Sequence, residues 1–337
     1  MTTTILVTGG TGFIGANLIR ELLKRDKVTV HVLCEPPATP AALWRLATIL
    51  DQVIVHGIGL TETAKITQLI QSIKPNEIYH LAAYGGSPNQ LNQQLIFDVN
   101  FTGTVNLLNA CKAVGFDVFI NTGSSSEYGK RNVPMREDMA LEPVSDYAVA
   151  KAAATHFCLK EALAHNLPIY TVRPFSVYGD YEIPGRLIPT VLVGSITKQP
   201  LNLASPTNVR DYIYIKDMTA LYHAVATQKP KSAFIFNGGT GIQSSIADVI
   251  NTVEQITNCK LAITWGTAAS RPWEPTCWRA DIALAAQILN WQPTYSLATG
   301  LTNARTWFTQ HLNFYTERIT HAQPAPTTPI TQNTANT

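Results

Sequence analysis

Tyr147 and Lys151 have a spacing that suggests an acid/base pair. Three residues separate them, and residues 147–163 are predicted to form a helix. Residues four apart lie on one face of a helix, so the ammonium can lie beside the phenol. A neighbouring cation lowers the pKa of a phenol from its usual value near about 10 toward the range useful for proton transfer. The pair could therefore remove a proton from an alcohol while a hydride leaves its carbon. Most such pairs are solvated helix surface, but this one follows a predicted strand and a serine-rich loop.

A glycine-rich turn lies between the first predicted strand and an amphipathic helix, and it contains Gly9, Gly12 and Gly15 around Phe13 and Ile14. Glycines permit a tight turn and close approach of the backbone to a pyrophosphate, and the helix N-terminus offers N–H groups to the phosphates. An ordinary glycine-rich turn is the alternative. The flanking strand and helix favour a dinucleotide site.

Glu35 ends the second predicted strand. An acidic residue about 20 positions after the glycines binds the adenosine ribose hydroxyls and disfavours a 2′-phosphate, which favours NAD. An exposed loop glutamate fits the position equally well. No arginine follows it directly, and NADP stays open as the cofactor.

The elements that must position these residues are short apolar runs alternating with segments of helical periodicity over the first half of the chain. Strands alternating with helices of this length indicate βαβ units and a parallel sheet covered on both faces. We therefore predict an α/β fold with a Rossmann-type doubly wound parallel sheet. The predicted strands are residues 5–8, 28–34, 53–56, 78–82, 118–122, 169–173 and 234–237.

The sequence changes character after Arg173, where turn-rich pieces separate fewer clear helices. The best of these are residues 245–257 and 282–289, and Asp281 suits the N-cap of the second. We predict a Rossmann domain over residues 1–173, to which residues 212–243 return. Residues 174–211 and 244–315 would form a smaller C-terminal α/β lobe packed over the open edge of the sheet. Residues 322–337 contain three prolines and no charge, which predicts a disordered tail.

Composition excludes partners bound by bulk charge. Lys and Arg number 25 and Asp and Glu 23 among 337 residues, a net charge of +2. A nearly neutral chain has no field to attract nucleic acid or an anionic membrane surface. No apolar run approaches the roughly 18 residues of a membrane helix, and no signal-peptide pattern opens the chain, which predicts a cytoplasmic protein. The cysteines number five, are widely spaced and form no C-x-x-C pair, so we expect free buried thiols and no metal site.

A serine-rich loop, residues 122–129, follows the fifth predicted strand. Together with the glycine-rich turn and the Tyr147–Lys151 pair, it resembles the extended short-chain dehydrogenase/reductase family, specifically the nucleotide-sugar epimerases, dehydratases and reductases. The likeness covers residues 4–312. Further matching segments are residues 80–83, 99–104, 173–179, 210–214, 271–281 and 289–293.

The resemblance implies roles for individual residues. Tyr147 would be the acid/base, Lys151 would bind the nicotinamide ribose, and Ser124 would hydrogen-bond to the sugar hydroxyl or ketone. The other implied cofactor contacts are Gly9, Gly12, Phe13, Ile14, Gly15, Glu35, Leu81, Ala82, Ala83, Asn100 and Pro174. The implied substrate contacts are Ser125, Ser126, Ser176, Leu187, Ile188, Arg210 and Arg271. The two arginines would hold a diphosphate through their planar donor forks, although each could also be a structural or surface ion pair.

Several positions depart from the family pattern. Dehydratases of the family carry an Asp-Glu pair where this chain has Ser125 and Ser126, and Glu127 would point elsewhere if the segment is extended. Dehydration is therefore disfavoured. Ser176 replaces a phosphate-contacting Asn, and residues 57–60 lack the customary adenine-contacting Asp.

The resemblance implies an NAD-dependent nucleotide-sugar 4-epimerase that oxidises C4 transiently and returns the hydride to the other face. The alternative enzyme is an NADPH-dependent reductase of a nucleotide-linked 4-keto-6-deoxy sugar. Retention of Ser124, Tyr147 and Lys151 argues against a non-catalytic NAD(P)-binding regulator or RNA-associated protein, and Arg210 with Arg271 argues against a small-alcohol reductase. The expected partners are a nucleotide-diphosphate sugar and a second copy of the chain, bound through helices around residues 100–114 and 147–163.

Overall fold

The computed structural model describes residues 2–87, 89–231, 234–267 and 275–315. Its main sheet has seven strands, all parallel, in the order β11-β6-β5-β4-β1-β2-β3. The predicted Rossmann-type parallel sheet is confirmed. The strands are β1 (Thr3–Thr8), β2 (Val28–Cys34), β3 (Val53–Gly57), β4 (Glu77–His80), β5 (Val118–Thr122), β6 (Ile169–Pro174) and β11 (Ile235–Gly238).

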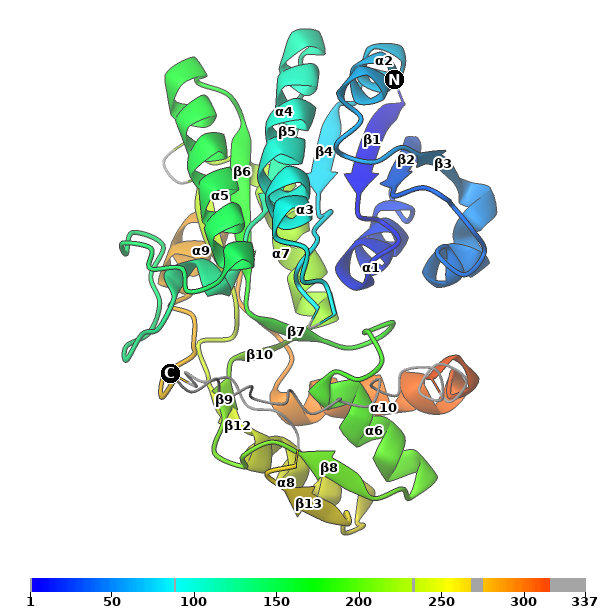
Figure 1. Cartoon of the computed structure of the whole chain (residues 1–337), viewed down its shortest axis with the longest axis vertical. Helices are drawn as coiled ribbons and strands as arrows, with labels where there is room; N and C mark the ends of the chain where they lie inside the picture. The colour runs from blue at the N-terminus through cyan, green and yellow to red at the C-terminus, as the bar shows by residue number, and fades with distance from the viewer. Residues whose placement is uncertain (1, 88, 232–233, 268–274, 316–337) are drawn as a thin grey trace, which may run out of the picture.

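The main strands read as continuous apolar runs because helices bury both faces of the sheet. Residues of α1 and α7 pack on one face, and residues of α2, α4 and α5 on the other. Figure 1 shows α4 and α5 side by side along the sheet. These helices are α1 (Phe13–Leu22), α2 (Thr63–Ile73), α4 (Gly103–Val114), α5 (Asp146–His165) and α7 (Ile215–Gln228). The shorter helical pieces are η1 (Trp44–Gln52), α3 (Gln93–Phe97), η2 (Asp98–Thr102) and η3 (Ser125–Tyr128).

The strand register aligns the carboxyl ends of the central strands. Thr8 of β1 lies opposite Leu33 of β2 and His80 of β4. Thr122 of β5 lies opposite Val172 of β6. The loops that follow these strands therefore meet at one edge, where α/β proteins of this kind bind ligands. Strand β4 ends at His80, two residues earlier than predicted, because the chain there turns toward the glycine-rich loop after β1.

The remaining elements form a smaller lobe beyond the carboxyl ends of the main strands (Figure 1). Its two-stranded sheets pair β10 with β7, β12 with β9, and β13 with β8. One hydrophobic core cluster continues from the main sheet into α6, α8 and α10, so the two parts are packed as one body. The elements of the lobe are β7 (Ser176–Tyr178), α6 (Leu187–Thr197), β8 (Leu201–Leu203), β9 (Val209–Arg210), β10 (Tyr212–Tyr214), β12 (Ser244–Ser245), α8 (Ile246–Thr257), β13 (Ile263–Trp265) and α10 (Leu297–Gln310). Helix α9 (Ala283–Leu289) is an exception, because it lies beside the main sheet.

Details of the second half differ from the prediction. Helix α9 packs against α7 and β11, although it lies in the range predicted for the lobe. Asp281 lies one residue before the N-cap, Ile282, and its carboxylate accepts a hydrogen bond from Ala283 N at 2.9 Å. The predicted tail, residues 322–337, lies outside the described residues.

All five cysteines are free thiols, but the prediction that they are buried is wrong for one of them. Cys259 is exposed, because it follows the C-terminus of α8 on the surface. Among the described residues, no three His, Cys, Asp or Glu side chains are grouped to hold a metal ion. Within the same ranges, no helix has the length and apolar character to cross a membrane.

Candidate active site

The glycine-rich loop forms a cradle whose backbone is packed too closely to admit side chains at Gly9 and Gly15. Gly9 has φ of +67°, and a Cβ atom built there would lie 2.5 Å from Ala82 N. A Cβ atom on Gly15 would lie 2.4 Å from the carbonyl oxygen of Gly9. Helix α1 begins just after Gly12, which has no side chain to cap it. Among the described residues, no side chain therefore caps the first-turn N–H groups, which are suited to an anion.

The loop after β4 is held against this cradle by buried hydrogen bonds. Thr8 Oγ1 lies 2.7 Å from His80 Nδ1 and accepts a hydrogen bond from Ala82 N at 3.2 Å. His80 Nε2 lies 2.8 Å from Thr104 Oγ1. Burial, with a contribution from the charge of Lys151, lowers the pKa of His80 to about 3, so the ring is neutral. This network holds Leu81 and Ala82 against the cradle, and Ala83 follows them in the chain.

Glu35 is exposed at the carboxyl end of β2, next to β1. A Cβ atom on Gly59 would lie 3.0 Å from Glu35 Oε2, so the carboxylate leans toward the segment after β3. Burial and the nearby Glu62 raise the pKa of Glu35. An arginine that the sequence analysis missed, Arg45, donates to the carbonyl of Thr11 in the glycine-rich loop at 3.3 Å.

Tyr147 and Lys151 lie in the first two turns of α5, which Ser145 caps by accepting from Ala148 N. Lys151 is 1% exposed, and its ammonium makes no hydrogen bond to any residue that the structure describes. Burial lowers the pKa of Lys151 to about 8, although Glu127 opposes the shift. Buried charges are ordinarily paired, so this ammonium is suited to a ligand hydroxyl.

The charge of Lys151 is expected to lower the pKa of Tyr147, but burial has the largest effect on that pKa. Burial raises the pKa of Tyr147 to about 12, while a hydrogen bond with Ser124 and the charge of Arg186 act in the opposite direction. The prediction of a lowered phenol pKa is therefore wrong for the protein without ligands. The physical reason is that desolvation of the phenolate outweighs the favourable charges.

The serine-rich loop is a 3₁₀ turn, η3, and not an extended segment as the sequence analysis considered. Ser124 caps it, and its Oγ lies 2.7 Å from Ser126 Oγ. Ser125 is buried. Glu127 turns inward, where it is fully buried and paired with Arg173 at 2.8 Å, so it does not face the cleft as an acid.

The loop over residues 84–86 covers the ring of Tyr147. Gly85 has φ of +92°, and a Cβ atom on Gly86 would lie 3.9 Å from Tyr147 Cζ. Asn100 holds this loop: its amide accepts from Tyr84 N at 3.1 Å and donates to Tyr84 O at 2.6 Å. It also donates to Ile96 O, and its side chain is fully buried. The residue implied to contact the cofactor is therefore used inside the protein, where it positions the loop.

Arg186 comes from the lobe, its charge acts on Tyr147, and the sequence analysis did not single it out. It is exposed at the N-cap of α6 and donates to the carbonyl of Gly86 at 2.6 Å. Its only sequence signal was its place directly before the segment expected to lie near the nucleotide base. Of that segment, Leu187 is half-buried, whereas Ile188 is 2% exposed in the hydrophobic core.

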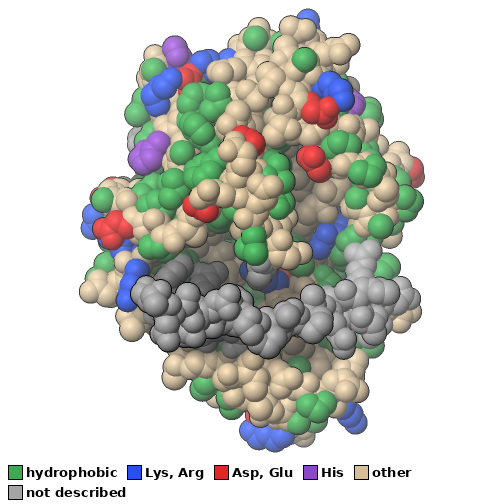
Figure 2. All heavy atoms as spheres, in the orientation of Figure 1, with side chains coloured by type: hydrophobic (Ala, Val, Ile, Leu, Met, Phe, Trp, Pro, Cys, Tyr) green, Lys and Arg blue, Asp and Glu red, His purple; other side chains and the backbone are tan. Residues whose placement is uncertain are grey.

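The other predicted substrate contacts lie where the lobe meets the sheet. Ser176 begins β7 and donates its N–H to Asp211 O at 2.9 Å, and Pro174 ends β6. Arg210 is half-buried, with its guanidinium 5.5 Å from the Trp278 ring. Arg271 lies outside the described residues. Figure 2 shows this face of the molecule hollowed between the sheet and the lobe.

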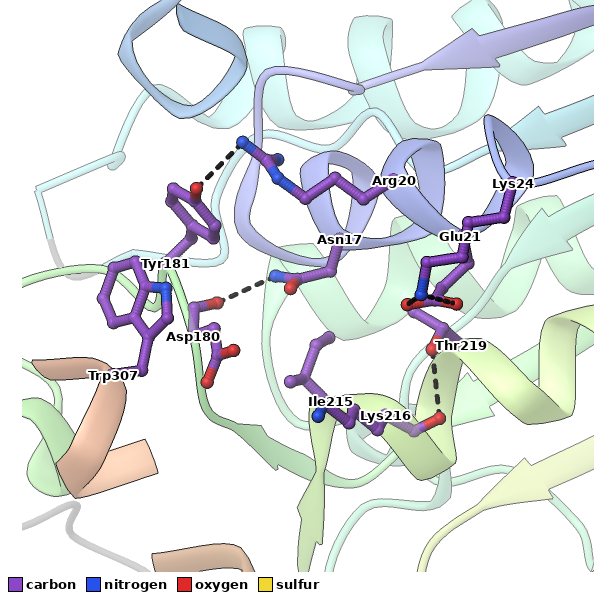
Figure 3. A pocket seen from close by; sticks show the side chains of 10 residues that line it. All are labelled: Asn17, Arg20, Glu21, Lys24, Asp180, Tyr181, Ile215, Lys216, Thr219 and Trp307. Carbon is purple, nitrogen blue, oxygen red and sulfur yellow. Dashed lines mark hydrogen bonds and ion pairs between the residues drawn. The ribbon is translucent and has the colours of Figure 1, made fainter. Parts of the chain in front are cut away.

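A separate pocket of about 230 Å³ lies between α1, α7 and α10 (Figure 3). Its polar groups are largely paired with one another: Arg20 donates to Tyr181 Oη at 2.9 Å, and Lys24 pairs with Glu21 at 2.7 Å. Asn17 donates to the carbonyl of Asp180 at 2.8 Å. The pocket therefore lies where the sheet domain meets the lobe. None of the described residues predicted to be catalytic, or to bind the cofactor or the substrate, line it.

Comparisons with known proteins agree with this geometry. A sequence model of the NAD dependent epimerase/dehydratase family matches residues 5–239. The UDP-glucuronate 4-epimerase of Thermodesulfobacterium geofontis is 29% identical, over 91% of this chain and 96% of that protein. The dTDP-glucose 4,6-dehydratase of Salmonella typhimurium is 25% identical, over 90% of this chain and 92% of that protein.

A solved structure supports the same relationship. The crystal structure of UDP-glucuronic acid 4-epimerase from Bacillus cereus, in complex with UDP-glucuronic acid and NAD, superposes with a TM-score of 0.81 at 29% identity. The match covers 92% of this chain and 100% of that chain.

Proposed function

Because the chain belongs to the NAD-dependent epimerase/dehydratase family, within the extended short-chain dehydrogenases/reductases, we propose that this enzyme is a nucleotide-sugar 4-epimerase. The observation that carries the proposal is the Lys151 ammonium, buried and without a hydrogen-bond partner among the described residues, one helical turn from Tyr147. Ser124 faces the same phenol. These groups suit oxidation of an alcohol and reduction of the resulting ketone.

The serine-rich loop argues against dehydration. Water loss from a sugar needs an acid and a base at neighbouring carbons. Ser125 and Ser126 occupy the two positions after Ser124, and Glu127 is bound to Arg173 away from the cleft. The proposed reaction therefore uses only C4: a proton leaves O4, a hydride leaves C4, and both return.

The residues of this chain fit NAD. Gly9, Gly12 and Gly15 allow the tight turn before α1 that would hold its pyrophosphate, and Lys151 would bind the nicotinamide ribose. NAD, when bound, accepts the hydride and returns it, and its positively charged nicotinamide favours the phenolate form of Tyr147. Tyr147 takes the O4 proton in the first half-reaction and gives it back in the second. Ser124 donates a hydrogen bond to O4 throughout.

Substrate recognition would fall to the lobe and the loops that face it. Arg210 and Arg271 would hold the diphosphate, and Leu187 would lie near the base. Arg186 is hydrogen-bonded to Gly86, which lies against Tyr147, so it is suited to contact the reacting sugar near its link to the diphosphate. UDP-sugars are the first substrates to test, because two of the relatives named above are UDP-glucuronate 4-epimerases, one of them solved with UDP-glucuronic acid and NAD.

We also propose a cytoplasmic homodimer. On the outer face of α5, Val149 is 40% exposed and Leu163 is 62% exposed. The ring of Phe157 on the same helix packs against the ring of Phe101 of η2, with the ring centroids 6.5 Å apart. Figure 2 shows hydrophobic side chains over this side of the molecule. Helices α4 and α5 of two copies would pack together there. Sedimentation velocity tests this arrangement, and a monomer at micromolar concentration contradicts it.

The activity test uses the purified protein with UDP-glucose or UDP-glucuronate and no added nicotinamide cofactor, with products separated by chromatography and identified by NMR. We expect the C4 epimer without net formation of NADH, and no product from Tyr147→Phe. Denatured protein should release NAD detectable by mass spectrometry. Stoichiometric NADPH oxidation with a nucleotide-linked 4-keto-6-deoxy sugar, and no epimer from any sugar nucleotide, would instead identify a reductase.

A further inference from the structure

A buried ion pair lies directly behind the proposed catalytic groups. Glu127 Oε2 accepts from Arg173 Nε at 2.8 Å, and the two side chains are 0% and 2% exposed. Glu127 comes from η3, after β5, and Arg173 from β6, so the pair joins two neighbouring strands at their carboxyl ends. Arg173 also donates to Tyr128 Oη at 2.9 Å. Neither residue has a place in the proton and hydride transfers above.

The other oxygen of the carboxylate binds the loop that carries the catalytic serine. Glu127 Oε1 accepts from Ser124 N at 2.7 Å and from Thr155 Oγ1 of α5 at 3.1 Å. Thr155 lies one helical turn beyond Lys151 on the same helix, four residues further along. One carboxylate therefore ties Ser124 to the helix of Tyr147 and Lys151.

We propose that Glu127 is a positioning residue of the active site: held by Arg173 and Thr155, it fixes the turn that presents Ser124 and places its carboxylate, paired with Arg173, behind Tyr147 and Lys151. This role rests on the proposed function for its catalytic consequence. A buried ion pair is weak evidence of stabilisation, because well-packed apolar residues often serve a fold as well. The hydrogen bond to Ser124 N is what links this pair to the site.

The charge of Glu127 acts on both proton-transfer groups. It raises the pKa of Tyr147 in the same direction as burial does, and it raises the pKa of Lys151 against the larger effect of burial. Other titratable and charged groups face these residues as well. Arg186 from the lobe and Tyr222 from α7 interact with Tyr147, and Cys158 from α5 and His80 from β4 interact with Lys151. Arg173 from β6 and Tyr128 from η3 face Glu127, and Glu137 from the following loop faces Tyr128.

The test replaces Glu127 with glutamine, which keeps the shape and loses the charge. We expect the acid limb of the kcat/KM profile of Glu127→Gln to move to lower pH by about one unit, because Tyr147 ionises more easily. The pH-independent kcat should fall about tenfold with little change in KM, since Ser124 is less well fixed. Glu142→Gln is the matched control: Glu142 pairs with Arg131 on the surface, and its profile should equal that of the unchanged enzyme.

A measurement without turnover separates this proposal from the proposed function. The pKa of Lys151, followed by NMR in lysine-labelled protein and assigned with Lys151→Met, should fall by about one unit in Glu127→Gln, even if no sugar nucleotide is a substrate. Thr155→Val is the second variant, because it removes one donor but keeps the charge. It should leave the pKa of Lys151 unchanged.

Two results overturn the proposal. One is a Glu127→Gln enzyme whose Lys151 pKa and pH profile match those of the unchanged enzyme, with activity lost only in proportion to unfolded protein. The other is an equal shift in Glu142→Gln.

Discussion

Replacing Lys151 by methionine should make the NAD-free protein more stable while it removes turnover. Methionine has a similar length and no charge, and the ammonium that it replaces is 1% exposed without a hydrogen bond to the described residues. Burial lowers the pKa of Lys151 to about 8, against a usual value near about 10.4. At about 1.4 kcal/mol per pKa unit, burial of the charged form costs at most about 3 kcal/mol of folding free energy.

The sign of the pH dependence follows from the lowered pKa. Between about pH 8 and pH 10.4 the unfolded chain binds the Lys151 proton and the folded chain does not. The penalty is therefore complete below about pH 8 and fades as the pH rises to the unfolded value. The stability gain of Lys151→Met should be complete at pH 7 and close to zero above about pH 10.4.

Urea unfolding of both proteins without NAD, at pH 7 and near pH 10, measures this gain. Lys24→Met is the control, since the Lys24 side chain is 68% exposed and its replacement should change stability by less than about 0.5 kcal/mol. Calorimetric titration should show NAD binding at least about tenfold weaker in Lys151→Met, through the lost charged hydrogen bond. A Lys151→Met protein that is less stable at pH 7, or a gain that does not shrink with pH, refutes the reasoning.

Three further changes test other parts of the structure. In Gly15→Ala the new Cβ atom would lie 2.4 Å from a backbone oxygen of the same loop, so titration should show NAD binding weakened by tenfold or more, whereas Gly57→Ala, with no atom nearer than 3.9 Å, should bind normally. Burial alone would raise the pKa of Glu77, but its paired hydrogen bonds from Arg25 hold that pKa below its usual value. Glu77→Gln should therefore lose about 1–2 kcal/mol of unfolding free energy at pH 7 in urea titrations, and the loss should disappear as the pH falls below about 4. Arg186→Met should raise KM for the nucleotide sugar about tenfold in steady-state assays and leave NAD affinity unchanged, because Arg186 comes from the lobe.

The sequence predicted the sheet well because strands buried on both faces carry an unbroken apolar signal. Strand β5 is an example, with all five residues buried. The errors fall where polar contacts between distant segments decide the chain path. Strand β4 stops at His80, where hydrogen bonds to Thr8 and Thr104 and the close approach of Ala82 to Gly9 redirect the backbone.

The site residues divide in the same way, into those that the local sequence indicates and those that depend on distant segments. Tyr147, Lys151 and Ser124 could be predicted, since their spacing and their places after strands are written in the local sequence. Arg186 and the Glu127–Arg173 pair could not, because they meet their partners across 100 and 46 residues of chain. Arg186 donates to the backbone carbonyl of Gly86. Every residue has such a carbonyl, so the residue type at position 86 does not indicate this hydrogen bond.

The position of β11 has a consequence for how the protein is made. This strand lies beside β6 in the main sheet, yet α6, α7 and four lobe strands lie between the two in the sequence. During synthesis the outer edge of β6 therefore stays unpaired until residue 238 has left the ribosome, with its row of N–H and C=O groups open to other chains. The lobe is also discontinuous in the sequence, because β11 of the main sheet lies between its segments. A nascent chain arrested before β11 is thus the form of this protein most in need of a chaperone.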